Sequence, residues 1–200
     1  DWFEVLARPV LRCDGEVSRC VGSFVGVTDA KTRQERLLHD AVHDNLTGLP
    51  NRELFLDRLD AAVTRARAEG AARPSIFFID IDRFKEVNDS VGISVGDSIL
   101  LTVARRLARL LKPQDTLARI EGDRFGLILI SEKEPERIAA FADSLRRALR
   151  AAITFAEREI FLTASIGIAM MDPQLRRIED MVKDAEIAMV NAKRAGGARM

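Results

Sequence analysis

The stretch Ser75-Ile76-Phe77-Phe78-Ile79-Asp80-Ile81-Asp82 decides the fold of this chain. It is a short, continuous apolar run that follows Pro74 and ends abruptly in acidic residues. A run of this length without alternation is typical of a strand that is buried on both faces of a sheet. Because side chains at the end of such a strand converge on a crevice, we expect a ligand to bind near Asp80 and Asp82.

The segments around this strand alternate between helical and extended patterns. Helices are predicted over residues 52–69, 84–91, 96–111, 135–152 and 178–194, and strands over residues 116–120, 125–130, 153–155 and 159–171. A tight turn at residues 121–124 joins two of these strands. The pattern predicts an α/β fold, an α+β sandwich in which helices wrap a mixed central sheet.

The beginning of the chain is predicted to be a separate element. Residues 10–13 and 17–27 form a hairpin around the turn Asp14-Gly15, and a connector helix follows over residues 30–43, capped by Asp29. Two strands alone are marginally stable in water, so residues 1–29 are expected to be the last strands of a truncated domain. The connector is either a packed helix or a dimerising signalling helix.

The charge balance excludes some partners. The 200 residues include 31 lysines and arginines against 31 aspartates and glutamates. Proteins that neutralise many phosphates usually carry a basic excess, so no nucleic-acid partner is expected. The sequence has neither an apolar run of about 18 residues nor a signal-peptide pattern. We therefore expect a cytoplasmic segment without membrane contact, any membrane anchor of its parent protein lying elsewhere.

Acidic residues at the end of the buried strand and in the turn suggest a metal site. Mg²⁺ in phosphoryl-transfer sites is held by one or two carboxylates together with the phosphates of the substrate. Asp80 and Asp123 could supply these carboxylates. Ordinary explanations also exist, because Asp82 can cap the next helix and Asp is common in turns.

Several ordered motifs carry a family resemblance. From about His43 to Arg199, the sequence resembles a GGDEF domain, the domain of the diguanylate cyclase family. The matching segments are Asp44-Asn45-Leu46-Thr47-Gly48-Leu49-Pro50-Asn51-Arg52, Asp80-Ile81-Asp82-Arg83-Phe84-Lys85-Glu86-Val87-Asn88-Asp89, Gly96-Asp97, Ala164-Ser165-Ile166-Gly167-Ile168-Ala169 and Asp184-Ala185-Glu186-Ile187-Ala188-Met189. The resemblance implies a sheet wrapped by helices, similar to nucleotidyl cyclases. It also implies a homodimer that joins two GTP molecules into cyclic di-GMP.

The resemblance assigns roles to individual residues. Asp80, the carbonyl of Ile81 and Asp123 would hold Mg²⁺ or Mn²⁺, and only together with GTP. No other cofactor is implied.

The nucleotide itself would be held by a second group of residues. By resemblance, Asn88 and Asp97 would read the guanine edge, and Gly122 would lie beside the nucleotide. Lys85 and Lys193 would meet the phosphates as point charges.

The signature turn departs from the family pattern. It reads Glu121-Gly122-Asp123-Arg124-Phe125 where the family has Gly-Gly-acid-Glu-Phe. Arg124 replaces a carboxylate implicated in catalysis, and a guanidinium neither accepts a proton nor binds a cation. Each of the two charge units changed is worth roughly 4 kcal/mol against a unit charge at ~4 Å and an effective dielectric of ~20. We predict that Arg124 is non-functional in catalysis and pairs with Glu121 across the turn.

Smaller departures agree with this. Ile93, Val190 and Gly197 stand where the family usually has His, Tyr and a phosphate-binding Arg. The product-inhibition motif, an Arg-x-x-Asp, reads Lys112-Pro113-Gln114-Asp115 and lacks the guanidinium fork. Lys112 and Asp115 are therefore expected to form a degenerate inhibitory site.

The sequence favours a degenerate GGDEF domain over residues 44–200, which acts as a GTP-binding or dimerising regulatory module in cyclic di-GMP signalling. The alternative is a slow but active cyclase. Residues 1–29 resemble the end of a PAS sensor domain, and the end of the chain resembles the junction to an EAL phosphodiesterase domain. The expected partners are GTP, these neighbouring domains and a second copy of the chain.

Overall fold

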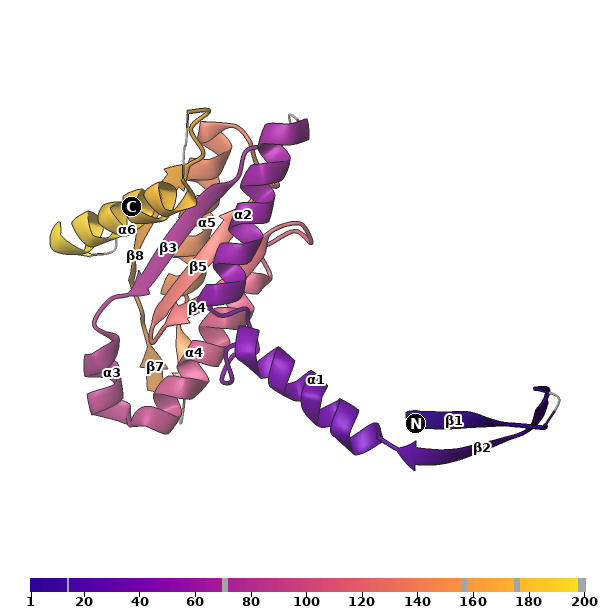
Figure 1. The fold of residues 1–200 in the computed structure, drawn as a ribbon. Helices are drawn as coiled ribbons and strands as arrows, with labels where there is room; N and C mark the ends of the chain where they lie inside the picture. Colours follow the sequence, from indigo (N-terminus) through magenta and orange to yellow (C-terminus); the bar gives the residue numbers. More distant parts are fainter. Residues whose placement is uncertain (14, 70–71, 156–157, 175–176, 198–200) are drawn as a thin grey trace. The chain divides into compact units, whose positions relative to one another are not determined.

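The computed structural model describes residues 1–13, 15–69, 72–155, 158–174 and 177–197 (Figure 1). The chain divides into two units, the first comprising Asp1–Ala41 and the second beginning at Val42. No helix in the described ranges has the length and apolar content needed to cross a bilayer.

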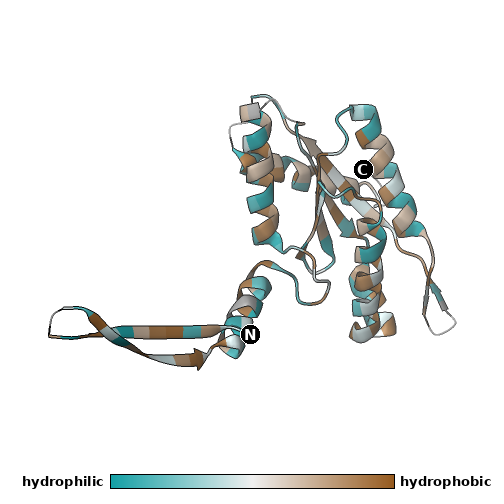
Figure 2. Cartoon of the chain, turned by 90° about the vertical axis from the view of Figure 1, so that its right-hand side faces the viewer, coloured by the Kyte–Doolittle hydropathy of each residue, from teal (hydrophilic) through white to brown (hydrophobic). Residues whose placement is uncertain are grey.

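The first unit contains a hairpin and a helix. Strands β1 (Phe3–Leu11) and β2 (Val17–Gly26) pair antiparallel, as the sequence predicts, and α1 (Thr28–Val42) follows. The first strand covers residues 3–11 rather than the predicted 10–13. Asp14 of the predicted turn lies outside the described residues. Asp29 lies inside the first turn of α1, so the prediction that it precedes and caps the helix is wrong. Hydrophobic and polar residues alternate along the hairpin (Figure 2), and Trp2 and Phe24 remain 60% and 76% exposed.

The second unit is built on a four-stranded sheet in the order β4-β5-β3-β8. Its strands are β3 (Ser75–Ile81), β4 (Thr116–Glu121), β5 (Arg124–Leu129) and β8 (Ala164–Met170). Every residue of β3 is buried, as its apolar run predicts. The predicted fold class is confirmed, but the described pairs of this sheet are all antiparallel rather than mixed. Strand direction alternates across the sheet: β4 and β3 run one way, and β5 and β8 run the other.

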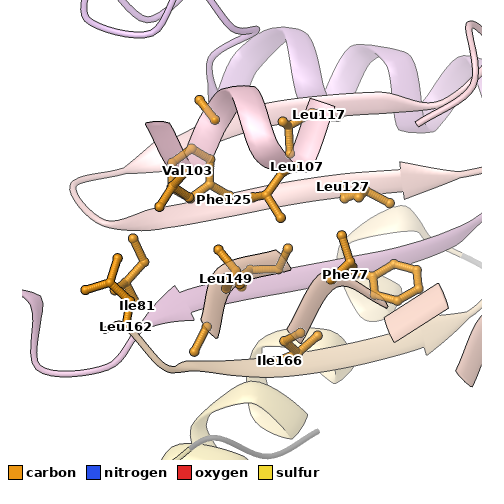
Figure 3. Close-up of a cluster of buried hydrophobic side chains, with 14 of the residues drawn as sticks. Phe77, Ile81, Val103, Leu107, Leu117, Phe125, Leu127, Leu149, Leu162 and Ile166 are labelled. Carbon is orange, nitrogen blue, oxygen red and sulfur yellow. The ribbon is translucent and has the colours of Figure 1, made fainter. Parts of the chain in front are cut away.

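Helices cover both faces of this sheet. Helices α2 (Arg52–Glu69) and α6 (Ile178–Arg194) pack on one face, where the buried cluster includes Ile76 and Phe78. Helices α4 (Ile93–Ala108) and α5 (Pro135–Arg150) pack on the other face, against Phe77 and Ile81 (Figure 3). The alternation of β3 side chains between two apolar layers explains why its sequence is apolar throughout. Helix α3 (Phe84–Val91) connects β3 to α4.

A glycine sets the distance between α6 and the sheet. A Cβ atom at Gly167 on β8 would lie 2.0 Å from the Ala185 carbonyl oxygen and 2.3 Å from the Met189 nitrogen. These distances are far below van der Waals contact, so the backbone of α6 can rest directly on β8 only because residue 167 lacks a side chain. This contact sets how closely α6 approaches the sheet, and α6 carries Lys193.

Two predicted elements of the second unit differ from the observed ones by more than two residues. The strand predicted over residues 159–171 is divided into β7 (Arg158–Ile160), which pairs with β6 (Ile153–Phe155), and β8 in the central sheet. Between them, the Thr163 carbonyl accepts a hydrogen bond from the Asp82 backbone nitrogen, 2.9 Å away. The helix predicted to begin at residue 96 begins at Ile93, and it ends at Ala108 rather than at residue 111.

Candidate functional site

A buried carboxylate with two cationic partners lies at the end of β3. The Asp80 side chain is 2% exposed. Its Oδ2 accepts a hydrogen bond from Arg124 Nε at 3.1 Å, and its Oδ1 accepts one from Lys193 Nζ at 2.6 Å. The Arg124 and Lys193 side chains are themselves about half exposed, at 48% and 46%. We call these three residues the Asp80 cluster.

Strand register explains this pairing and corrects the predicted one. Arg124 lies opposite Asp80 on β3 and also opposite Glu121 on β4, so all three side chains share one face of the sheet. Arg124 bonds to Asp80, and the predicted ion pair with Glu121 does not form among the described residues. A buried carboxylate depends on a countercharge, whereas the exposed Glu121 is solvated by water.

The signature turn holds a second carboxylate beside the Asp80 cluster. Gly122 has a φ of 53°, in the left-handed region that glycine adopts without strain. The Asp123 carbonyl accepts a hydrogen bond from the Ile81 nitrogen at 3.3 Å. Burial raises the pKa of the Asp123 carboxyl, and the negative charge of Asp80 raises it further. The two carboxylates are therefore close enough for the charge of one to affect the pKa of the other.

A cavity of about 280 Å³ opens next to the turn. Its lining residues are Phe84, Lys85, Asn88, Asp97, Leu100, Arg119, Gly122 and Asp123. The cavity brings together four of the five residues predicted to bind the nucleotide. The fifth, Lys193, lies in the Asp80 cluster, which adjoins the cavity through Asp123.

One polar atom in this cavity wall lacks a partner. The Oδ1 atom of Asn88 is buried and accepts no hydrogen bond from the described residues. A Cβ atom at Gly96 would lie 1.8 Å from this oxygen, so the position of the Asn88 side chain depends on a glycine in α4. An unsatisfied buried acceptor costs about 1–3 kcal/mol.

Sequence reasoning missed Arg119, which ties the turn to a distant segment. Arg119 Nε donates to the Gly122 carbonyl at 2.8 Å, and Nη1 donates to both carboxylate oxygens of Asp44 at 3.0 and 3.1 Å. Burial alone would raise the pKa of Asp44, but hydrogen bonds from Thr47 and Arg119 outweigh it and lower the pKa. Nothing in the local sequence marks this arginine, because its partner is 75 residues away.

Asp82 has a different role from Asp80. Its two carboxylate oxygens accept hydrogen bonds from Thr163 Oγ1 and Ser165 Oγ, each at 2.7 Å. The N-cap residue of α3 is Arg83, whose side chain makes no capping hydrogen bond, so Asp82 does not occupy the N-cap position. A Cβ atom at Gly197 would lie 2.9 Å from this carboxylate. Asp82 therefore joins β3 to the segment before β8 and lies against the end of α6.

The predicted inhibitory site is occupied by internal contacts. Asp115 Oδ1 accepts hydrogen bonds from the backbone nitrogens of Ile130 and Ser131, and Oδ2 accepts from Ser131 Oγ and the Lys112 nitrogen. Lys112 Nζ forms an ion pair with Glu132 at 2.8 Å. The hydrogen bond from Lys112 lowers the pKa of the Glu132 carboxyl. Asp115 thus stabilises a turn after β5.

The donors predicted for Mg²⁺ do not fit a divalent ion in this arrangement. Both oxygens of Asp80 already bind cationic groups, and Arg124 stands where a further carboxylate would be needed. In the described part of the chain, no three His, Cys, Asp or Glu side chains cluster closely enough to hold a metal ion. Asp123 and the Ile81 carbonyl alone make a weak site for a cation that prefers six oxygen ligands.

Comparison with known proteins identifies the domain. The family profile described as "Diguanylate cyclase, GGDEF domain" matches residues 41–199. This chain belongs to the GGDEF family. The resemblance inferred from the ordered motifs is thereby confirmed.

Curated relatives have the same domain within longer proteins. The chain is 37% identical over 174 residues to the bifunctional diguanylate cyclase/cyclic di-GMP phosphodiesterase MucR of Pseudomonas aeruginosa, covering 87% of this chain and 25% of MucR. It is 36% identical over 165 residues to the diguanylate cyclase TpbB of the same species, covering 82% of this chain and 38% of TpbB. The chain therefore spans well under half the length of these relatives.

Solved structures agree with the fold. The coiled coil and GGDEF domain of DgcB from Caulobacter crescentus, in complex with c-di-GMP, gives a TM-score of 0.78 at 28% identity, covering 86% of this chain and 91% of that one. The isolated GGDEF domain of TpbB gives 0.74 at 33% identity, covering 78% and 91%. The central sheet and its helices are therefore those of a GGDEF domain.

Proposed function

We propose that this GGDEF domain is catalytically impaired and acts in cyclic di-GMP signalling as a regulatory module that binds GTP. The observation that carries the proposal is the bond between Arg124 Nε and Asp80 Oδ2. In an active family member this place in the signature is acidic. Here it is a cation bound to the neighbouring carboxylate.

The Asp80 cluster lacks the groups that the cyclase reaction needs. Activation of a ribose hydroxyl requires an acceptor for its proton, and a guanidinium cannot serve as one. The neighbouring carboxylate, Asp80, is already bonded to two cationic side chains. Loss of the proton acceptor raises the barrier to reaction, and each ~1.4 kcal/mol added to the barrier slows the reaction tenfold. The missing acceptor therefore supports an impaired domain.

The cavity beside the turn supports retained nucleotide binding. Asn88 and Asp97 line it together, and both suit the polar edge of a guanine base. A carboxylate at Asp97 can accept from the N1–H and the N2 amino group of guanine, and the amide of Asn88 offers both a donor and an acceptor group. Lys85 and Lys193 supply positive charge for the phosphates.

The Lys112–Asp115 segment does not favour product inhibition. A carboxylate with four internal hydrogen bonds has little capacity left for a ligand. We therefore propose that cyclic di-GMP is not bound tightly there. Regulation would instead act through the nucleotide cavity.

Neighbouring domains complete the proposal. Residues 1–29 would be the last strands of a PAS-like sensor, residues 30–43 a connector, and residues 44–200 the module that acts on a downstream domain of EAL type or on a second copy. The exposed apolar side chains of the hairpin support the proposal that further elements of a sensor domain would pack against it.

One pair of measurements tests the function. The protein is titrated with GTP in a calorimeter, and the same sample is incubated with GTP and Mg²⁺ or Mn²⁺ and assayed for cyclic di-GMP by chromatography. Binding without product is the expected result. Turnover near one per second would overturn the proposal. A slow product signal that Asp80→Asn abolishes would instead favour the weakly active cyclase.

A further inference from the structure

The charges of the Asp80 cluster and the neighbouring Asp123 balance without a metal ion. Asp80 and Asp123 provide two carboxylates, and Arg124 and Lys193 provide two permanent positive charges, with Arg124 and Lys193 each within 3.1 Å of an Asp80 oxygen. A carboxylate at residue 124 would leave two net negative charges in the same place. That deficit equals the charge of one divalent cation, so the change to arginine supplies the charge that a metal ion would otherwise bring.

Arg124 also has unused hydrogen-bond donors. Only its Nε bonds to Asp80, and its terminal nitrogens donate to none of the described residues. The side chain is 48% exposed, so these donors face solvent. A guanidinium fork matches two phosphate oxygens with parallel hydrogen bonds, as an ammonium does not.

We infer that this site binds the triphosphate of a nucleotide without a divalent cation, with Arg124 as the phosphate-binding group. The inference rests on the proposed GTP-binding function. Lys193 bonds to Oδ1 of Asp80, and Arg124 bonds to Oδ2 through Nε alone. The two terminal nitrogens of Arg124 therefore remain available to a phosphate. Metal-free GTP, which carries more negative charge than its Mg²⁺ complex, is the preferred ligand.

The test compares GTP binding with and without metal. Calorimetric titrations of the wild-type chain with GTP are run in EDTA and in excess Mg²⁺. We expect binding in EDTA to be at least as tight as in Mg²⁺. Binding that is tenfold or more weaker in EDTA would overturn the inference and leave the proposed function intact. The absence of GTP binding in both conditions would overturn the proposed function and the inference with it.

Two variants and a control make the assignment to Arg124 specific. Arg124→Glu is expected to weaken binding in EDTA more than tenfold and to bind GTP better when Mg²⁺ is added. Arg124→Gln removes the charge without adding a new one and is expected to weaken binding in both conditions. Arg177→Gln, an exposed arginine paired with Glu179 outside the site, is expected to bind as the wild type does.

A metal-only measurement gives an independent readout. Free and bound Mn²⁺ are distinguished by their electron paramagnetic resonance signal in the absence of nucleotide. The wild type is expected to bind no Mn²⁺ at concentrations where Arg124→Glu does. Stoichiometric Mn²⁺ binding by the wild type that is lost in Asp80→Asn would overturn the inference. Thermal melting of each variant shows that it is folded before titration.

Discussion

Two carboxylates of this domain, Asp80 and Asp115, are both saturated by internal partners, but in different ways. Asp80 is bonded to two side chains that are each about half exposed, Arg124 and Lys193. Asp115 is bonded mainly to backbone nitrogens. Side chains can exchange one partner for another, whereas backbone groups of a folded turn cannot. The half-exposed cations around Asp80 therefore remain available to a ligand, and Asp115 is committed to the fold.

This difference separates two kinds of motif loss. At the Asp80 cluster, the substitution at residue 124 changes the charge that a ligand meets and keeps polar groups facing solvent. At the inhibitory segment, the loss of the guanidinium at Lys112 leaves a short loop with structural contacts only. A degenerate sequence motif can thus change its ligand in one place and lose it in another.

The largest expected effect is on stability at Asp115. Replacing it by Ala removes four hydrogen bonds and leaves backbone donors of Ile130 and Ser131 without their acceptor. Each bond to a charged acceptor contributes about 1.5–3 kcal/mol, and partial access of water recovers some of this. We expect the free energy of unfolding to fall by about 3 kcal/mol in urea titrations.

The matched control for that change is Lys112→Gln. Lys112 is exposed, and its pair with Glu132 is a surface ion pair worth at most about 1 kcal/mol. If Lys112→Gln destabilised the domain as much as Asp115→Ala, the stability of this segment would come from its ion pair, and Asp115 would not be the structural residue.

A medium effect is expected when the Arg124 bond is removed. Arg124→Gln leaves the buried Asp80 carboxylate with Lys193 as its only described cationic partner. Because Arg124 is half exposed, solvent screening reduces the cost to about 1 kcal/mol. The measurement is the free energy of unfolding of the wild type, both single variants and the double variant with Asp80→Asn.

The double variant decides whether the two residues interact. In the Asp80→Asn background, the carboxylate is gone and Arg124→Gln is expected to cost almost nothing, which gives a coupling energy of about 1 kcal/mol. Equal costs in both backgrounds would show that the Arg124 side chain stabilises the domain by packing and that the bond to Asp80 contributes nothing.

Local patterns predict the elements of this fold well, because each element carries its own signal. The apolar run of β3 predicts a strand buried on both faces, and the periodicity of residues 52–69 and 178–194 gives the observed bounds of α2 and α6. The single strand predicted over residues 159–171 is wrong for a different reason. The strand is interrupted where Thr163 bonds to Asp82, about 80 residues earlier, and no local sequence pattern indicates that contact.

Partners within the site are less predictable. Glu121 and Asp80 both lie opposite Arg124, and only the burial of Asp80 makes it the preferred partner. Burial depends on α6 packing over the sheet, which a sequence pattern for the turn does not contain. The motifs nevertheless predict which residues line the cavity beside the turn, because the motif segments meet where β3 ends and the β4–β5 turn begins.

The smallest expected effect concerns Asp123, whose raised pKa follows from burial and from the charge of Asp80. The folded domain holds this proton more tightly than the unfolded chain does. Ionised Asp123 therefore disfavours folding, and its contribution to stability falls as the pH rises from about 4 through the folded pKa.

Asp123→Asn removes the charge, so the variant is expected to be more stable than the wild type at pH 7 by up to about 0.5 kcal/mol. The difference should shrink toward pH 3 in urea titrations, with Asp57→Asn, an exposed position on α2, as the control. A less stable Asp123→Asn at pH 7 would mean that Arg124 and Lys193 fully compensate this second carboxylate, and the Asp80 cluster would then be as internally committed as Asp115.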